Sequence, residues 1–177
     1  KVVAVSDVNG GVTGFKNVSE LWNHFLAHNN LELPGTDKLT QQELLHLDVD
    51  VLIPAALADA ITEANASGIR AKVIVEGANA PTTPGGDAIL NENHILVVPD
   101  ILANSGGVIV SYFEWVQDKQ NYFWTADEVK SNLNEIMMRS FREVEEMART
   151  KKVSWREAAH MIGVARVAEA HRLRGLY

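Results

Sequence analysis

One carboxylate and two asparagines are the side chains best placed for chemistry, because each comes soon after a short apolar run. Asp7 follows the run VVAVS, Asn79 lies in a glycine-containing segment after VIV, and Asn104 comes after LVVPDILA. An asparagine offers a donor and an acceptor to a carboxamide, and an aspartate accepts hydrogen bonds from ribose hydroxyls. Two small residues after a further run, Ala55 and Ala56, leave room for a flat ring near the backbone. Together these residue types favour a ligand with a ribose, a ring and a carboxamide.

Short strands must position these side chains, and four apolar runs predict them at residues 2–6, 50–53, 73–75 and 95–98. The first run is apolar on both faces, which is typical of a covered parallel sheet. Helices are predicted between the strands, at residues 18–29, from residue 40, at residues 55–65 and from residue 84. The alternation predicts a parallel sheet with right-handed crossovers. Ligands bind beyond the carboxyl ends of such strands, so we expect the candidate residues to meet there.

Only helices are predicted after residue 107, the last two beginning at the capping pairs Thr125 with Glu128 and Ser154 with Glu157. The sequence therefore predicts an α/β fold: an incomplete Rossmann-type, doubly wound, mainly parallel sheet followed by C-terminal helices. We expect one incomplete dinucleotide-binding domain over residues 1–177, with the α/β part at 1–107 and the helices at 108–177.

Composition excludes several classes of function. The chain has 177 residues, a net charge of −7 and no cysteine. No basic stripe suits nucleic acid, and no apolar run approaches the roughly 20 residues of a membrane span. Without cysteine there is no thiol nucleophile or thiolate metal site, and a reducing, cytoplasmic location is expected. His24 and His28 have metal-ligand spacing but no third ligand nearby, so we expect no metal site.

The chain begins at Lys1 inside a predicted strand, without an initiator methionine. A ribose-binding aspartate normally follows a glycine-rich phosphate loop by about 20 residues. We therefore expect a piece of a longer protein, with the first strand and the phosphate loop upstream. From position alone, Asp7 is equally a nucleotide ligand or a turn aspartate.

Four segments resemble the cofactor domain of the glutamate dehydrogenases, in the same order and at comparable spacing. They are DVLIPAA at 50–56, EGANAPTTP at 76–84, PDILANSGG at 99–107 and VSYFEW at 110–115. The related leucine, valine and phenylalanine dehydrogenases share the architecture, but PTTP and SYFEW favour glutamate as the substrate of the parent enzyme.

The resemblance implies a role for each candidate in cofactor binding. Asp7 matches the acidic residue that contacts the adenosine ribose. Ala55 and Ala56 match a small pair against the nicotinamide ribose. Asn79 and Asn104 match the asparagines that position the nicotinamide half. NAD or NADP is therefore the expected cofactor, and NAD is favoured because a carboxylate at Asp7 repels a 2′-phosphate.

Substrate contacts are implied at one position only. Ser111 matches a serine that reaches the side-chain carboxylate of the substrate. The catalytic lysine and aspartate of the family belong to a substrate domain that precedes this segment, so no catalytic residue is expected here. Ala80 stands where glycine is usual, which would restrict the loop if that position requires a positive φ.

The implied reaction is the reversible oxidative deamination of L-glutamate to 2-oxoglutarate and ammonia, with hydride transfer to the nicotinamide. The full enzyme is expected to be a homo-oligomer, and the isolated chain to be inactive. Two alternatives remain: a noncatalytic folded or oligomerising remnant, and a domain of a sibling leucine, valine or phenylalanine dehydrogenase.

Overall fold

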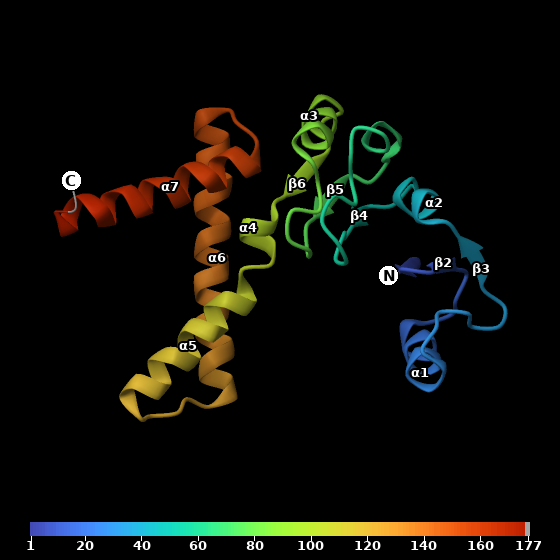
Figure 1. Cartoon of the computed structure of the whole chain (residues 1–177), viewed down its shortest axis with the longest axis horizontal. Coiled ribbons are helices and arrows are strands. Elements are labelled where there is room, and N and C mark those ends of the chain that lie inside the picture. The colour runs from blue at the N-terminus through green and yellow to red at the C-terminus, as the bar shows by residue number, and fades with distance from the viewer. Residues whose placement is uncertain (176–177) are drawn as a thin grey trace.

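Three short strands form a parallel sheet at the centre of the molecule, in the order β4-β5-β6. They are β4 (Val51–Leu52), β5 (Val73–Val75) and β6 (Leu96–Val98). The computed structural model describes residues 1–175, and Figure 1 shows this sheet between the N-terminal elements and the C-terminal helices. Ile74 pairs with Leu52 on one side and with Val97 on the other. Three of the four predicted strands are thus confirmed.

The main hydrophobic core lies around the parallel sheet, where the side chain of Ile74 is 0% exposed. Helix α3 (Pro84–Glu92) covers the sheet and contributes Leu90 to this core. Thr83 caps α3 by accepting a hydrogen bond from the amide of Gly86, and proline occupies the first turn, as predicted. The buried members of the core are Leu52, Ile61, Ala66, Ile69, Ala71, Ile74, Leu90 and Val97.

A second, antiparallel sheet contains the first predicted strand. It consists of β1 (Ala4–Asp7), β2 (Gly10–Thr13) and β3 (Asp37–Leu39), in the order β1-β2-β3. The prediction that residues 2–6 join the parallel sheet is wrong. The chain reverses directly after β1, where Gly10 has a φ of 133° that suits glycine, so β1 pairs with its neighbour in sequence.

Helix α1 (Val18–His28) follows the antiparallel sheet and is capped by Asn17, which accepts a hydrogen bond from the amide of Glu20. The apolar side chains of this helix are largely exposed: Leu21 is buried, but Trp22 is 56% exposed. Leu21 packs with Val12 and Phe15 in a small hydrophobic core that is separate from the core around the parallel sheet. The antiparallel sheet and α1 therefore form a small unit at one end of the molecule (Figure 1).

Short helices join these layers, and one predicted helix is absent. Helix α2 (Gln41–Leu45) begins where a helix was predicted, at a capping box formed by Thr40 and Glu43. Residues 55–65 are not helical, and only the single turn η1 (Ala66–Gly68) follows them. The helix prediction is wrong because the backbone here pairs with a neighbouring segment: the amide of Ile61 donates to the carbonyl of Pro81 at 2.8 Å. This tertiary pairing overrides the helix preference of alanine.

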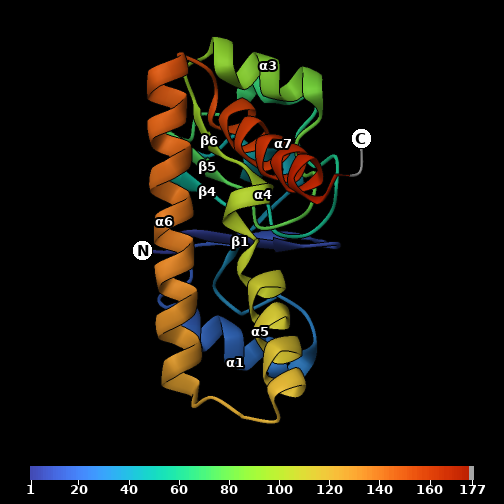
Figure 2. The same ribbon diagram turned by 90° about the vertical axis from the view of Figure 1, so that its left-hand side faces the viewer.

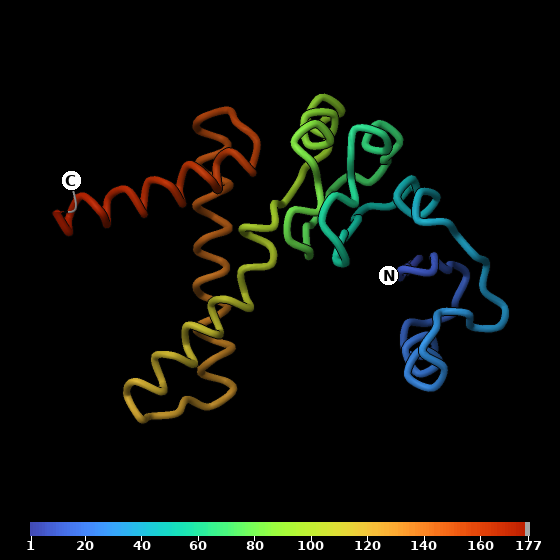
Figure 3. The backbone as a smooth tube through the Cα atoms, in the orientation of Figure 1, coloured from blue at the N-terminus to red at the C-terminus, as the bar shows by residue number. Residues whose placement is uncertain are grey.

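The C-terminal part is helical, as predicted, with one extra short helix directly after β6. The helices are α4 (Asp100–Ala103), α5 (Gly106–Gln120), α6 (Ala126–Lys151) and α7 (Trp155–Arg174). Both predicted capping boxes, at Thr125 and Ser154, are present. The backbone trace in Figure 3 shows α5 and α6 joined by a short turn, and α7 crossing the C-terminal part of α6.

The first turns of α7 pack against α6 and α4, whereas the rest of α7 extends away from the body (Figures 1 and 2). Ala158 and Ala159 are buried in a core with Val144, but Ala165 and Ala168 are exposed. The alanines of α7 thus pack closely only in its first turns. In residues 1–175, no helix combines the length and the apolar character needed to cross a membrane.

Candidate functional site

The loops that follow β4 and β5 meet at the carboxyl edge of the parallel sheet. The amides of Gly77 and Ala78 both donate to the carbonyl of Pro54, at 3.0 and 2.9 Å. A Cβ placed on Gly77 would lie 3.0 Å from the Cβ of Ala55, so glycine favours this close approach. The structure therefore brings the predicted small pair beside the segment that carries Asn79.

Asn79 and Asn104 are in direct contact. The Nδ2 group of Asn104 donates to Oδ1 of Asn79 at 2.7 Å and to the carbonyl of Ala78 at 3.2 Å. Asn79 is exposed and Asn104 half-buried. Across residues 1–175, no protein partner engages Nδ2 of Asn79 or Oδ1 of Asn104. The pair therefore keeps one amide donor and one carbonyl acceptor for a ligand.

Two carboxylates anchor the backbone on which these asparagines lie. Asp100 Oδ2 accepts a hydrogen bond from the amide of Ala80 at 2.7 Å. Glu76, whose side chain is 0% exposed, accepts one from the amide of Asp100 at 2.9 Å. Both acids, which lie just beyond strand ends, therefore anchor backbone amides of the site. Ala80 has a φ of 47°, so the position that usually holds glycine does require the left-handed conformation.

Arg156, near the start of α7, lies among three carboxylates. Its guanidinium donates to Glu76 at 2.6 Å and to Asp87 at 3.0 Å, and lies 3.5 Å from Asp100. Burial alone lowers the pKa of Arg156, but the hydrogen bond and charge of Glu76, followed by those of Asp87, outweigh burial and raise this pKa. The guanidinium therefore stays charged and neutralises the acids beneath the site.

Asp7 lies apart from this cluster, at the end of β1 in the antiparallel sheet. Its Oδ1 accepts a hydrogen bond from the amide of Asn9 at 2.7 Å, and its carbonyl accepts one from Gln41. Asp7 thus adopts the turn geometry that the sequence left open as an alternative. The carboxyl-edge position expected for it is wrong, because β1 is not hydrogen-bonded to the parallel sheet. Its contact with a ribose stays a prediction.

Two of the remaining candidates, Ala56 and Ser111, have exposed side chains. Ala56 follows Ala55 and is exposed. Ser111 is exposed on α5, about two helical turns beyond Asn104. The rings of His24 and His28 are 4.5 Å apart, and His24 contacts Asn30. The described residues contain no group of three or more His, Cys, Asp or Glu side chains that could hold a metal ion.

Comparison with known families identifies the chain. The family model described as Glutamate/Leucine/Phenylalanine/Valine dehydrogenase matches residues 1–175. The chain belongs to this family.

Named relatives within the Glutamate/Leucine/Phenylalanine/Valine dehydrogenase family are glutamate dehydrogenases. The glutamate dehydrogenase of Thermotoga maritima is 50% identical over 181 residues, which cover 100% of this chain and 43% of that protein. A cryptic catabolic NAD-specific glutamate dehydrogenase of Bacillus subtilis is 46% identical, and the match covers 99% of this chain and 42% of that protein. The chain thus spans about two fifths of the length of these relatives.

Solved structures agree with this assignment. The hetero-hexameric glutamate dehydrogenase of Thermus thermophilus, in a leucine-bound form, has a TM-score of 0.91 at 34% identity. The match covers 100% of this chain and 42% of that one. The L-tryptophan dehydrogenase of Nostoc punctiforme has a TM-score of 0.62 at 23% identity over 76% of this chain and 38% of that chain, and so shares the fold. The α/β, Rossmann-type fold class predicted from the sequence is confirmed.

Sequence reasoning missed one residue of the candidate site, Arg156. One signal was available, because a cation in the first turn of a helix opposes the helix dipole. Arg156 directly follows the first residue of α7, where acidic side chains are preferred. The three carboxylates that bind Arg156 lie 56 or more residues earlier, so the sequence did not indicate its partners.

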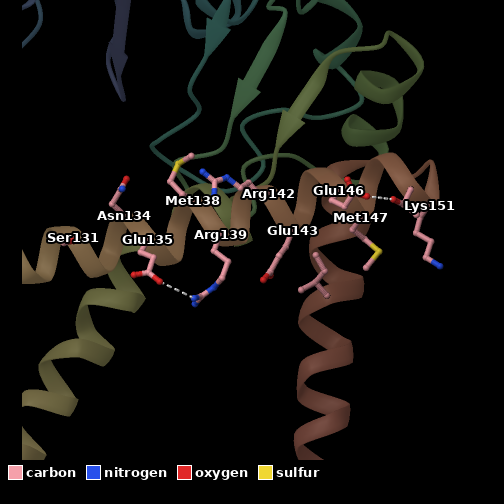
Figure 4. A pocket seen from close by; sticks show the side chains of 12 residues that line it. Ser131, Asn134, Glu135, Met138, Arg139, Arg142, Glu143, Glu146, Met147 and Lys151 are labelled. Carbon is pink, nitrogen blue, oxygen red and sulfur yellow. Dashed lines mark hydrogen bonds and ion pairs between the residues drawn. The ribbon is translucent and has the colours of Figure 1, made fainter.

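An open groove of about 1000 Å³ lies along α6 and α7, apart from the strand ends. Figure 4 shows its lining, in which Met138 and Met147 alternate with charged side chains of both signs. Arg139 and Glu135 form one exposed ion pair within it. None of the candidate cofactor residues lines this groove.

Proposed function

We propose that this chain is the cofactor-binding part of an NAD(P)-dependent glutamate dehydrogenase. The parent reaction is the oxidative deamination of L-glutamate to 2-oxoglutarate and ammonia. The observation that carries the proposal is the Asn79–Asn104 pair at the carboxyl edge of the parallel sheet, where one amide donor and one carbonyl acceptor remain for a ligand. We extend the same assignment to all of residues 1–177 as one incomplete dinucleotide-binding domain, with residues 1–107 as its α/β part and 108–177 as its helices.

The two asparagines fit the carboxamide of nicotinamide. Nδ2 of Asn79 would donate to the carboxamide oxygen, and Oδ1 of Asn104 would accept from its N–H group. Ala55 and Ala56 leave room for the ring and its ribose beside this pair. When bound, the nicotinamide supplies hydride transfer, and these residues orient it and exclude water from one side of the cleft.

The preferred dinucleotide is NAD. A carboxylate at Asp7 accepts a hydrogen bond from a free 2′-hydroxyl and repels a 2′-phosphate. The Bacillus subtilis relative described as NAD-specific supports this choice. In the bound state we expect Asp7 to contact the adenosine ribose in addition to its turn hydrogen bond.

Substrate contact and turnover belong to the longer protein. Ser111 is proposed to reach the side-chain carboxylate of glutamate from α5. The remaining three fifths of the relatives' length would supply the catalytic residues, so the isolated chain should give no glutamate-dependent NADH formation. A homo-oligomeric and cytoplasmic parent enzyme is part of the same proposal. The hetero-hexameric Thermus relative supports an oligomer without specifying identical subunits, and the lack of cysteine is compatible with a reducing compartment.

A second candidate function is a noncatalytic module that associates with other chains. Exposed apolar side chains beside β4, Val51 and Ile53, favour it, because an apolar strand edge is a template for pairing. Sedimentation showing a monomer would oppose this candidate. The sibling leucine, valine or phenylalanine dehydrogenases are separated from glutamate dehydrogenase by the substrate preference of the full-length enzyme.

Calorimetric titration of the chain with NADH and with NADPH tests the cofactor proposal. We expect tighter binding of NADH, and an Asn79→Ala variant should weaken it about tenfold through the lost hydrogen bond. Asp7→Ser should reduce the difference in affinity between NADH and NADPH. Asn93→Ala, which changes the C-cap of α3, is the matched control and should leave both affinities unchanged. Absence of NADH binding, or equal affinity in Asn79→Ala, would contradict the proposed site.

A further inference from the structure

We propose that Arg156 is the positioning residue that holds Asn79 and Asn104 in their mutual geometry. The proposal rests on the cofactor role given to these asparagines, and it adds a residue of the C-terminal helix α7 to the site. Arg156 contacts neither asparagine, so it must act through the groups that it binds.

Asp100 transmits the effect of Arg156 to both asparagines. Its carboxylate lies 3.5 Å from the guanidinium and accepts a hydrogen bond from the amide of Ala80, the residue after Asn79. Its carbonyl accepts a hydrogen bond from the amide of Asn104 at 3.0 Å. One residue therefore fixes the backbone of both members of the pair.

Glu76 provides a second route from Arg156 to Asp100. One of its oxygens accepts from Arg156 at 2.6 Å, and the other accepts from the amide of Asp100 at 2.9 Å. The Glu76 side chain is fully buried, so water cannot replace the guanidinium without rearrangement of the loop. The two routes together fix both the position and the orientation of Asp100.

The charge balance explains why a cation is required here. Glu76, Asp87 and Asp100 place three carboxylates within 3.5 Å of one guanidinium whose side chain is 19% exposed. Without Arg156 these acids would repel one another in a poorly solvated region, and removing one partner of a buried pair is strongly unfavourable. The segments that carry the acids would then move apart.

The shape of the guanidinium matters as well as its charge. Nε, Nη1 and Nη2 of Arg156 each approach a different carboxylate. A lysine has a single ammonium group, which cannot reach three acids in this fork-like arrangement. Arg156→Lys should therefore restore the charge but only part of the geometry.

Amide hydrogen exchange and side-chain NMR signals test this positioning role. In Arg156→Gln we expect the amide of Ala80 to exchange at least about tenfold faster, relative to the amide of Ile74 in the core. The side-chain NH₂ signals of Asn104 should move toward those of a free amide. Referencing exchange to Ile74 separates loss of positioning from loss of global stability.

Arg166→Gln is the matched control, because Arg166 also lies on α7 and pairs with a carboxylate of α6, but in an exposed position. This variant should leave the exchange rate of the Ala80 amide and the side-chain signals of Asn104 unchanged. Adding Asp100→Asn to Arg156→Gln should cause little further change, since both act on the same contact. In Arg156→Lys, the exchange rate of the Ala80 amide and the Asn104 signals should lie between those of the original protein and those of Arg156→Gln. If the glutamine variant does not fold, the lysine variant takes its place in the test.

Unchanged Ala80 exchange and Asn104 signals in a folded Arg156 variant would overturn the proposal, as would an equal effect in Arg166→Gln. Titration with NADH distinguishes failure of the positioning role of Arg156 from failure of the cofactor role of the asparagines. Faster Ala80 exchange in Arg156→Gln, together with no NADH binding by the original chain, leaves the positioning role intact and removes the cofactor assignment. NADH binding that Arg156→Gln weakens at least tenfold supports both.

Discussion

The two sheets of this protein begin from similar apolar runs but provide very different environments. β5 is central in the parallel sheet, and its Ile74 is fully buried within a core of eight residues. The run at the N-terminus forms β1 in an antiparallel sheet, where Val2 and Val3 are exposed and the core contains three residues. An apolar run therefore predicts a strand, but the partner strands determine how deeply it is buried.

The difference extends to the candidate site. Around the parallel sheet, hydrogen bonds connect Asn79, Asn104, Glu76 and Asp100, and Arg156 neutralises the acids. Asp7 pairs with Gly10 in the antiparallel sheet, and its carboxylate and carbonyl accept hydrogen bonds from Asn9 and Gln41. The candidate half-site thus lies beside the larger core, and the residue proposed to contact the ribose lies on the smaller unit.

Matched leucine truncations give the largest expected effects and test the contrast between the two cores. Leu90→Ala should lower the free energy of unfolding by about 4 kcal/mol, and Leu21→Ala by about 2 kcal/mol, because the smaller core relaxes around the lost atoms more easily. Urea unfolding followed by circular dichroism measures both. Equal losses, or a larger loss for Leu21→Ala, would show that the two cores are equivalent.

Backbone strain offers a smaller contrast between a site loop and the end of α1. Ala80 and Asn29 both have positive φ, at 47° and 52°. Ala80→Gly should raise the free energy of unfolding by about 0.5 kcal/mol, because relief of left-handed strain exceeds the entropy added to the unfolded chain. Asn29→Gly should change it little, since asparagine tolerates this conformation. Thermal unfolding that shows no gain in Ala80→Gly would argue against strain in the loop.

The smallest expected effect concerns two exposed carboxylates with lowered pKa values. In Glu32 the pKa is lowered mainly by the hydrogen bond and charge of Lys38, beside the antiparallel sheet. In Glu63, beside the parallel sheet, it is lowered mainly by its own backbone amide and then by the Thr83 hydroxyl. Each carboxylate stabilises the fold above its ordinary value of 4.5, and this contribution is lost as the pH falls through the lowered pKa.

Salt should separate these two carboxylates. Screening weakens an exposed ion pair but has little effect on hydrogen bonds from neutral groups. High salt should therefore raise the pKa of Glu32 toward its ordinary value and leave the pKa of Glu63 nearly unchanged. NMR titrations at low and high salt measure both pKa values. Lys38→Gln serves as the control and should remove the salt dependence of Glu32. An equal salt response of the two groups would contradict the assigned causes.

Local signals in the sequence predicted most of the helix boundaries. Thr40, Thr125 and Ser154, each with a glutamate three residues later, marked helix starts that the structure reproduces. Capping depends on residues within one turn, so it can be inferred without knowledge of the fold. The strand ends near Asn79 and Asn104 were predictable for a similar reason, since β5 and β6 are short and bounded by turn residues.

Features that depend on distant partners were not predictable in this way. Residues 55–65 favour a helix by composition, but their pairing with Pro81 decides their structure. The pairing of β1 is a different case, because its partner strand follows directly after a tight turn and Asn9-Gly10 is a local hairpin signal. Arg156 meets Glu76 only in the folded chain, so neither its burial nor its partners were evident. The family resemblance supplied roles for residues but did not indicate this contact.

The bond between Arg156 and Glu76 joins residues 80 positions apart in sequence. During synthesis at roughly 5–20 residues per second, Glu76 therefore emerges about 4–16 seconds before its partner exists. The strands and their loops can assemble during this interval, but the buried carboxylate remains without its cation. Closing so long a loop is also entropically slow compared with forming the neighbouring helices. The asparagine pair is thus expected to acquire its final order late, as the last step in maturation of the nascent chain.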